Sequence, residues 1–135
     1  MAASYLLDSN IIIAAIKGEP RALLNRLAGL AANRLHLSSL VEAELHYGAE
    51  KSQHGAQARA ALDSITAGMT PLPFDADDAR AYGRLRAALE RKGATIGPVD
   101  LLIAAQAVAR DLVLITDNLR EFRRVPGLRC ENWLR

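Results

Sequence analysis

Tyr5-Leu6-Leu7-Asp8-Ser9-Asn10 places an apolar run directly before an acidic residue, near the start of a chain of 135 residues. We interpret residues 5–7 as a short buried strand and Asp8 as the residue at its carboxyl end. A carboxylate is unfavourable in a dry core. Ligand sites in open α/β sheets, however, lie outside the carboxyl ends of the strands, where an acid can hold a hard cation. The segment therefore predicts an α/β fold with a site at one edge of its sheet.

A second carboxylate opens a long apolar helix, in Gly97-Pro98-Val99-Asp100-Leu101-Leu102-Ile103-Ala104-Ala105. Pro98 is typical of a first helical position, so Asp100 lies in the first turn. The helix dipole favours any carboxylate there by roughly 0.3 to 1 kcal/mol. For Asp100 taken by itself, this structural explanation is as good as a functional one. The joint placement of several acids at strand ends and at this helix start favours a site.

Strand-like and helical patterns alternate along the whole chain. We expect strands at residues 5–7, 35–37, 69–72, 112–115 and 129–131, and helices at 9–17, 20–30, 38–50, 56–67, 75–92 and 98–110, with a short helix within 116–124. Strands separated by helices predict a parallel sheet covered on both faces. No repeat or linker interrupts the pattern, so we expect a single domain over residues 1–135.

The composition limits the classes of protein. The 17 basic and 15 acidic residues give a pI near 9.0, which permits binding to nucleic acid, although a plain solvated surface explains it too. No apolar run approaches the roughly 18 residues that span a bilayer. We therefore expect a soluble cytoplasmic protein with no membrane partner. Cys130 is the sole cysteine, which excludes an internal disulfide and a metal site built on paired cysteines.

Two glutamates on the expected helix at 38–50 have different explanations. Glu42 is spaced from Ser39 as a capping box, and this structural role accounts for it. Glu44 has apolar neighbours three and four positions away, so we expect it on the buried face of the helix. A glutamate there needs a partner to offset its desolvation, which makes Glu44 the stronger candidate ligand.

A polar segment, Thr116-Asp117-Asn118, follows the clearest buried strand. If that strand neighbours the first one, these side chains lie beside Asp8. Loops are also rich in Asp and Asn because these residues form turns. Asp8 could likewise be a helix N-cap, but Ser9 can fill that position and leave Asp8 free.

Three or four carboxyl or amide oxygens, without Cys or His ligands, form a site for Mg²⁺ or Mn²⁺. Such ions stabilise charge on a phosphoryl centre and activate water, so phosphodiester hydrolysis is the expected reaction. The three histidines lie in different elements, with no spacing that suggests a metal pair: His36, His46 and His54.

Several segments together resemble the PIN-domain ribonucleases, and among them the VapC-type toxins of toxin–antitoxin pairs. The resemblance covers nearly the whole chain. Its segments are Leu6-Leu7-Asp8-Ser9-Asn10-Ile11-Ile12, Val41-Glu42-Ala43-Glu44-Leu45-His46-Tyr47-Gly48, Gly97-Pro98-Val99-Asp100, Ile103-Ala104-Ala105, Ile115-Thr116-Asp117-Asn118-Leu119-Arg120-Glu121-Phe122, Arg124-Val125-Pro126-Gly127-Leu128 and Glu131-Asn132-Trp133.

The resemblance implies a three-layer α/β/α sandwich and a metal-dependent endoribonuclease that cuts structured RNA. It also implies a homodimer and a cognate antitoxin that inserts a peptide over the active site. The last third is similar to toxins that cut the anticodon loop of initiator tRNA, which makes a tRNA the expected substrate.

The family's acidic positions fall on residues of this chain, with one departure. The first three fall on Asp8, Glu44 and Asp100, the expected metal ligands. The fourth falls on Asn118, an amide that lowers the negative charge and puts tight binding of a second metal in doubt. Asp117 supplies a charge whose direction the sequence leaves open, and Thr116 is a further candidate through its hydroxyl.

Arg120, Arg123 and Arg124 are candidates for RNA phosphate contacts, because they follow the fourth acidic position.

Other functions are less consistent with the sequence. A receiver domain would need an acid pair after the first strand and a lysine near a late strand, and both are missing. A haloacid-type phosphatase would need a second aspartate after Asp8. The alternative that stays open is a catalytically silent module that binds RNA or protein.

Overall fold

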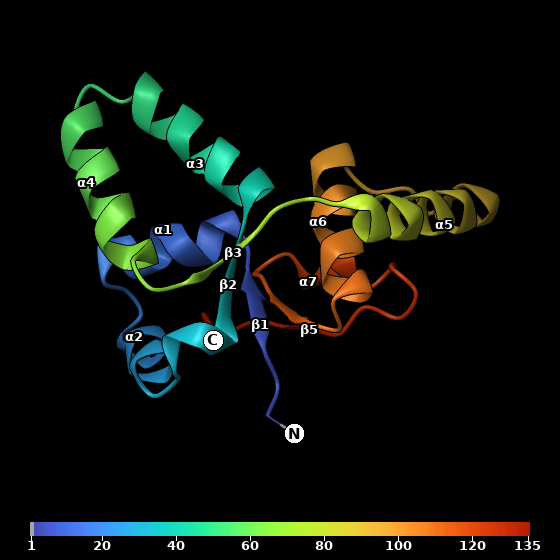
Figure 1. The fold of residues 1–135 in the computed structure, drawn as a ribbon, viewed down its shortest axis with the longest axis horizontal. Helices are drawn as coiled ribbons and strands as arrows, with labels where there is room; N and C mark the ends of the chain where they lie inside the picture. Colours follow the sequence, from blue (N-terminus) through green and yellow to red (C-terminus); the bar gives the residue numbers. More distant parts are fainter. Residues whose placement is uncertain (1) are drawn as a thin grey trace.

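The computed structural model describes residues 2–135, which form a five-stranded parallel sheet between helical layers (Figure 1). The strands are β1 Tyr5–Leu7, β2 Leu35–Ser38, β3 Thr70–Leu72, β4 Val113–Ile115 and β5 Cys130–Glu131. The helices are α1 Ser9–Lys17, α2 Arg21–Ala28, the short 3₁₀ helix η1 Ala32–Arg34, α3 Ser39–Lys51, α4 Gly55–Thr66, α5 Ala76–Lys92, α6 Pro98–Ala109 and α7 Leu119–Phe122. The predicted α/β class, the parallel sheet and the α/β/α sandwich are confirmed.

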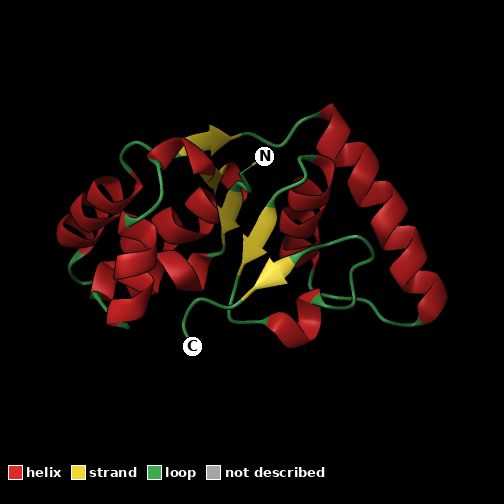
Figure 2. Cartoon of the chain, turned by 90° about the horizontal axis from the view of Figure 1, so that it is seen from below, coloured by secondary structure: helices red, strands yellow, loops and turns green. Residues whose placement is uncertain are grey.

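The strand order β3-β2-β1-β4-β5 places β1 at the centre of the sheet. The chain runs outward from β1 through β2 and β3 on one side, and continues through β4 and β5 on the other. The strands stay parallel, but the side of β1 on which the next strand is added changes between β3 and β4. Such a switch point leaves a crevice at the carboxyl ends of β1 and β4. Figure 2 shows these strands side by side between the helices. Asp8 and Thr116, the residues that follow β1 and β4, therefore meet at this edge.

Alternate residues of the strands face different helical layers. On β2, Leu35 lies near apolar residues of α2 and α4, whereas Ser38 donates a hydrogen bond to Gln106 of α6 on the other face. In Figure 1, α1 to α4 lie on one side of the sheet and α5 and α6 on the other. Leu6 and Leu7 of β1 are fully buried, and burial of each such side chain contributes roughly 1.5 to 3 kcal/mol.

The N-caps of two helices lie one residue earlier than predicted. Asp8, not Ser9, is the N-cap of α1, because its carboxylate accepts a hydrogen bond from the Ser9 N–H at 2.9 Å. Ser38, not Ser39, caps α3 through a 3.1 Å bond from the Leu40 N–H, so the predicted capping box of Ser39 and Glu42 is wrong. The reason is the same in both places. In each case the chain passes from the strand into the helix without a loop. The residue directly before the helix is therefore the one whose side chain reaches the free N–H groups of the first turn.

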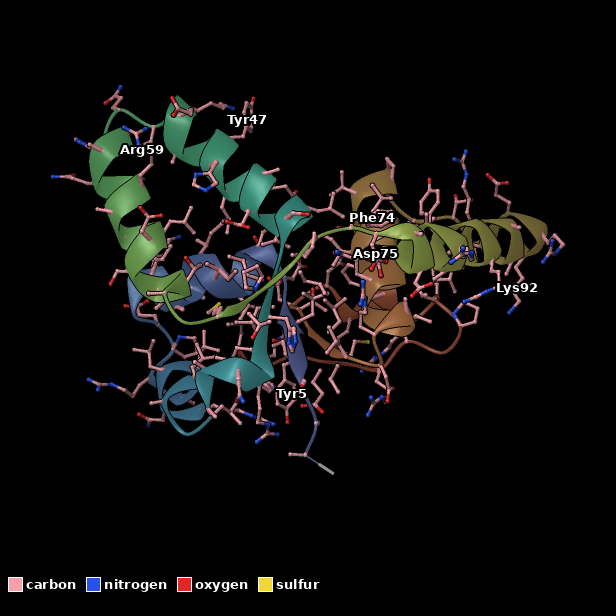
Figure 3. The ribbon with its side chains drawn as sticks, in the orientation of Figure 1. Tyr5, Tyr47, Arg59, Phe74, Asp75 and Lys92 are labelled. Atoms are coloured by element: carbon pink, nitrogen blue, oxygen red, sulfur yellow. The ribbon has the colours of Figure 1, made fainter. Side chains whose placement is uncertain are left out.

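The helix α5 begins within one residue of its predicted start, and its N-cap is Asp75 (Figure 3). Asp75 and Asp78 form a capping box, with hydrogen bonds of 2.9 and 3.2 Å to each other's backbone N–H. Arg110, at the end of α6, pairs with both carboxylates. Because Asp78 is fully buried, this pair fixes the start of α5 against the end of α6.

No helix within residues 2–135 combines the length and the apolar character needed to cross a membrane.

Candidate active site

Asp8 lies at the tip of the central strand and is only 8% exposed. Its two carboxylate oxygens accept hydrogen bonds from the Ser9 N–H at 2.9 Å and from the Thr116 hydroxyl at 2.8 Å. Burial raises the pKa of Asp8, an effect that these two bonds partly offset and that the nearby charge of Asp117 reinforces. Asp8 is therefore a rigidly held carboxylate with no basic side chain bonded to it among the described residues.

Asp100 lies in the first turn of α6 and is partly buried. Among residues 2–135, no group donates a hydrogen bond to its side chain. Burial raises the pKa of Asp100 to about 6, and repulsion from Asp8, Glu121 and Glu44 adds to this shift. Two of the other predicted acids, Asp8 and Glu44, thus lie within electrostatic range of Asp100. A helix-dipole role alone does not explain why the ionised form of Asp100 is disfavoured.

Glu44 is exposed, so the prediction that it lies on the buried face of its helix is wrong. The buried residues of α3 are Val41, Leu45 and Ala49, a stripe one position further along. Tyr47, three positions after Glu44 and one of the apolar neighbours behind that prediction, projects outward and is 63% exposed (Figure 3). Glu44 nevertheless borders the site, because the Ser9 hydroxyl donates to its Oε1 at 3.0 Å.

The two residues after Thr116 lie on different sides of the site. Asp117 accepts a 3.2 Å hydrogen bond from the side-chain amide of Asn10, and its charge acts on Asp8. Asn118 donates its backbone N–H to the Thr116 hydroxyl at 3.1 Å and its side-chain amide to Glu121 at 2.8 Å. The structure therefore places Asp117 beside Asp8 and directs the amide of Asn118 towards Glu121.

Glu121 is the site residue that the sequence reasoning missed. Its carboxylate accepts a 2.7 Å hydrogen bond from the Gly97 N–H, just before α6. That bond, with the one from Asn118 and the charge of Arg124, holds the pKa of Glu121 below its usual range. A Cβ on Gly97 would lie 3.6 Å from an Asp100 oxygen and 3.7 Å from a Glu121 oxygen, so both carboxylates flank this glycine. The spacing of Asn118 and Glu121, three residues apart on a short helix, was the available signal.

The remaining candidates lie around this cluster or away from it. Arg124 donates to the Thr95 carbonyl at 3.0 Å, in the loop before α6, while Arg120 and Arg123 are exposed on the α7 segment. His46 and His54 are exposed, and His36 lies at the opposite end of the sheet. As the side chains stand, no group of three or more His, Cys, Asp or Glu within residues 2–135 could hold a metal ion.

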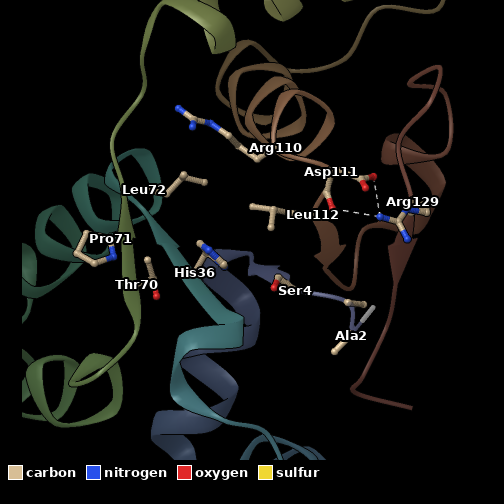
Figure 4. A pocket seen from close by; sticks show the side chains of 11 residues that line it. Ala2, Ser4, His36, Thr70, Pro71, Leu72, Arg110, Asp111, Leu112 and Arg129 are labelled. Carbon is tan, nitrogen blue, oxygen red and sulfur yellow. Dashed lines mark hydrogen bonds and ion pairs between the residues drawn. The ribbon is translucent and has the colours of Figure 1, made fainter.

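A cavity of about 520 Å³ lies at the opposite edge of the sheet, between His36, Leu72, Leu112 and Arg129 (Figure 4). The cationic groups at this edge are already paired. Arg129 bonds both the carboxylate and the carbonyl of Asp111, at 2.8 and 3.1 Å, and Arg110 is bound by acids of α5. We therefore assign the active site to the acid cluster at the carboxyl edge, where charge is unpaired and where α/β sheets bind ligands.

Comparison with known proteins agrees with this assignment. The PIN domain family model matches residues 5–128. The chain is 43% identical over 130 residues to Ribonuclease VapC2 of Rickettsia felis, covering 96% of this chain and 97% of that protein. It is 40% identical over 129 residues to the tRNA(fMet)-specific endonuclease VapC of Salmonella typhimurium, with 96% and 97% covered.

Solved structures give the same result. The VapBC2 structure from Rickettsia felis, bound to a DNA fragment from their promoter, superposes with a TM-score of 0.90 at 42% identity, covering 96% of this chain and 98% of the other. DNA-bound VapBC from Salmonella typhimurium gives a TM-score of 0.91 at 39% identity, with 98% and 99% covered. The resemblance seen in the sequence is confirmed: the chain belongs to the PIN domain family, and its relatives at 40% identity or more include VapC ribonucleases.

Proposed function

We propose that the protein is a ribonuclease that hydrolyses RNA phosphodiester bonds, the toxin of a toxin–antitoxin pair. The observation that carries the proposal is the acid cluster at the tip of β1, where the charges of Asp8, Glu44 and Glu121 all act on Asp100. Full-length relatives at 40 to 43% identity are named ribonuclease or tRNA endonuclease. A silent binding module has no need to hold these acids together against their repulsion.

The cluster suits Mg²⁺, with Mn²⁺ as an alternative, because its donors are carboxylate oxygens and the Asp100 carboxylate accepts no hydrogen bond within residues 2–135. We propose Asp8, Asp100 and Glu44 as the ligands, with Asp117 and Glu121 at the margin. A bound ion would stabilise charge on the phosphoryl group and lower the pKa of a water. A bound cation would relieve the repulsion between Asp100 and the other acids, and this relief would favour binding of the ion.

The residues of this chain divide the remaining tasks. The Thr116 hydroxyl and the Ser9 N–H hold the Asp8 carboxylate in one orientation. Glu121 fixes the start of α6 through Gly97, and so keeps Asp100 at the edge of the sheet. The amide of Asn118 holds Glu121 in turn. A framework fixed in this way keeps the acids in place before the substrate binds, which is what electrostatic catalysis requires.

We propose a tRNA as the substrate, because a relative with 40% identity over 96% of this chain is named a tRNA(fMet)-specific endonuclease. Arg120 and Arg123 are exposed next to Asn118 and are proposed as phosphate contacts. Arg124 has the same proposed role, although its Nη1 is already bound to the Thr95 carbonyl.

The proposed partner is a cognate antitoxin, because similar structures include a toxin–antitoxin complex from Klebsiella pneumoniae and a member of the VapBC family of toxin–antitoxin systems from Mycobacterium tuberculosis. The chain also presents exposed apolar side chains on α1, where Ile13 and Ile16 are each 38% exposed beside a cavity of about 450 Å³. Such a surface is suited to a protein partner.

We propose in addition that the toxin forms a homodimer. Sedimentation of the isolated protein at micromolar concentration should show the dimer, and a monomer would contradict it.

Incubation of the purified protein with initiator tRNA, an elongator tRNA and an unstructured RNA of equal length tests the proposed activity. Cleavage of initiator tRNA is expected with Mg²⁺ or Mn²⁺ and is expected to stop when a chelator is added. Mapping of the cleaved ends identifies the position cut. Binding of the RNAs without any cleavage, in every metal tried, would favour the silent module instead.

A further inference from the structure

The first two residues of α1 contact two different neighbours of Asp8. The helix begins directly after the central strand, so Ser9 and Asn10 follow the site residue without a loop. Neighbouring residues of an α-helix project about 100° apart. Their side chains therefore point to different sides of Asp8, towards α3 in one case and towards the segment after β4 in the other.

Ser9 bonds the acid on the α3 side. Its hydroxyl donates to Glu44 Oε1 at 3.0 Å, and no other described group donates to that carboxylate. Glu44 is exposed, so its long side chain would otherwise sample several rotamers in solvent. The separate backbone N–H of Ser9 holds Asp8. One residue therefore fixes the acid that follows β1 and an acid of α3 relative to each other.

Asn10 bonds the acid on the other side. Its side-chain amide donates to Asp117 Oδ1 at 3.2 Å, and no other described group donates to that exposed carboxylate. The charge of Asp117 reaches Asp8. The arrangement matches that of Ser9: a short polar side chain at the start of α1 holds an acid from another element.

We propose that Ser9 and Asn10 are positioning residues, Ser9 for Glu44 and Asn10 for Asp117. This inference rests on the proposed function and adds to it. Both donors are neutral, so they orient the carboxylates without cancelling their charge. A lysine or arginine in the same place would pair with the acids and weaken their attraction for a cation. Ordered but unneutralised acids are what a cation site needs before the ion binds.

Activity measurements test each bond with matched controls. Ser9→Ala and Asn10→Ala should each lower kcat roughly tenfold with little change in KM, as loss of a group that orients a ligand does. Ser9→Thr keeps the hydroxyl and should restore activity. Ser64→Ala and Asn33→Ala make the same chemical changes at exposed positions away from the site and should leave activity unchanged.

Double variants show whether each residue acts through its partner. Once Glu44→Ala has removed the acid, adding Ser9→Ala should cause no further loss, and the same holds for Asn10→Ala added to Asp117→Ala. A tenfold loss that persists in the absence of the partner acid would overturn the assignment for that residue.

A measurement that needs no RNA keeps the inference separate from the proposed function. Carbon-13 NMR of the side-chain carboxyl groups should show the Glu44 signal moving in Ser9→Ala but not in Asn10→Ala. The Asp117 signal should show the opposite pattern. If wild type cuts no RNA, the proposed function fails, whereas this crossed pattern still decides the two bonds. Signals that stay unchanged in both variants would overturn the inference even in an active enzyme.

Discussion

Two buried aspartates at opposite edges of the sheet differ in how their charge is balanced. Asp78 is fully buried beside Arg110, which lines the cavity at the opposite, amino edge, and the guanidinium of Arg110 and the N–H of Asp75 satisfy it. Asp8 is 8% exposed at the carboxyl edge, where its partners are a hydroxyl and a backbone N–H, and its neighbours are other acids. A buried acid paired with a cation is explained by the fold. A buried acid without one is a candidate for function.

The largest expected effect is the loss of cleavage when the unpaired acids lose their charge. Asp8→Asn and Asp100→Asn keep the shape of each side chain but remove the charge that is proposed to hold the ion. Cleavage of RNA in Mg²⁺ should fall by at least roughly 100-fold in each. Asp77→Asn, an exposed acid of α5, is the control and should cut normally. Undiminished cleavage by either site variant would remove that residue from the site.

The amino edge should show the opposite behaviour, with stability lost and chemistry kept. Arg110→Met leaves the Asp78 carboxylate buried without a cation. Because Arg110 is one-third exposed, we expect the free energy of unfolding to fall by about 2 kcal/mol, less than for a fully buried pair. Urea unfolding measures this. The matched variant Arg80→Met breaks an exposed pair on the same helix and should lower stability by less than about 0.5 kcal/mol.

That second prediction has an internal check. Folded Arg110→Met, assayed well below its melting temperature, should cut RNA at the wild-type rate per folded molecule. A large loss of activity in the folded variant would mean that the amino edge takes part in the reaction, and the contrast between the two edges would then fail.

The sheet could be predicted from the sequence because its signals are local. Apolar runs mark the strands, and Gly18, with its positive φ of 79°, ends α1 where a glycine is expected. The start of α5 was likewise predicted to within one residue. These features depend on residues within a few positions of each other, so tertiary contacts do not change them.

The details of the site depend on contacts between distant segments, and these were predicted less well. The exposure of Glu44 follows from how α3 is rotated against its neighbours, which the sequence of α3 alone does not determine. The N-cap role of Asp8 follows from the abrupt turn out of β1. Glu121 enters the site through a bond to Gly97, 24 positions away. Asp8, Asp100 and Thr116 were found because strand ends and helix starts are themselves local signals.

A smaller effect is expected on stability without metal. The pKa of Asp100, raised from 3.8 to about 6, lies above that of the unfolded chain, so ionisation opposes folding. The contribution of Asp100 to stability is therefore complete below pH 3.8 and is lost as the pH rises through 6. In chelator at pH 7.5, Asp100→Asn should be more stable than wild type by about 1 to 2 kcal/mol, after allowance for solvent screening.

Thermal unfolding at several pH values measures this difference, which should shrink towards pH 4 as the wild-type carboxyl becomes protonated. Mg²⁺ should raise the melting temperature of wild type by a few degrees and that of Asp100→Asn by less. If Asp100 serves only the helix dipole, its replacement lowers stability by roughly 0.3 to 1 kcal/mol and leaves the metal response unchanged. The two explanations thus differ in sign.

The smallest expected effect concerns the arginines of the α7 segment, one of which, Arg124, acts with its charge on Glu121. Arg123→Ala should weaken binding of tRNA a few-fold and lower the slope of log affinity against log salt by about 0.7 to 0.9, the value for one lost phosphate contact. Arg84→Ala removes an equal charge from an exposed position on α5, a helix that packs on α6 at one side of the molecule (Figure 1). It should change neither quantity measurably. Binding of catalytically inactive Asp8→Asn protein to labelled tRNA, at several salt concentrations, allows the comparison without cleavage. Equal slopes in the two arginine variants would show that positive charge acts over the whole surface, and the proposed phosphate contact at Arg123 would then be wrong.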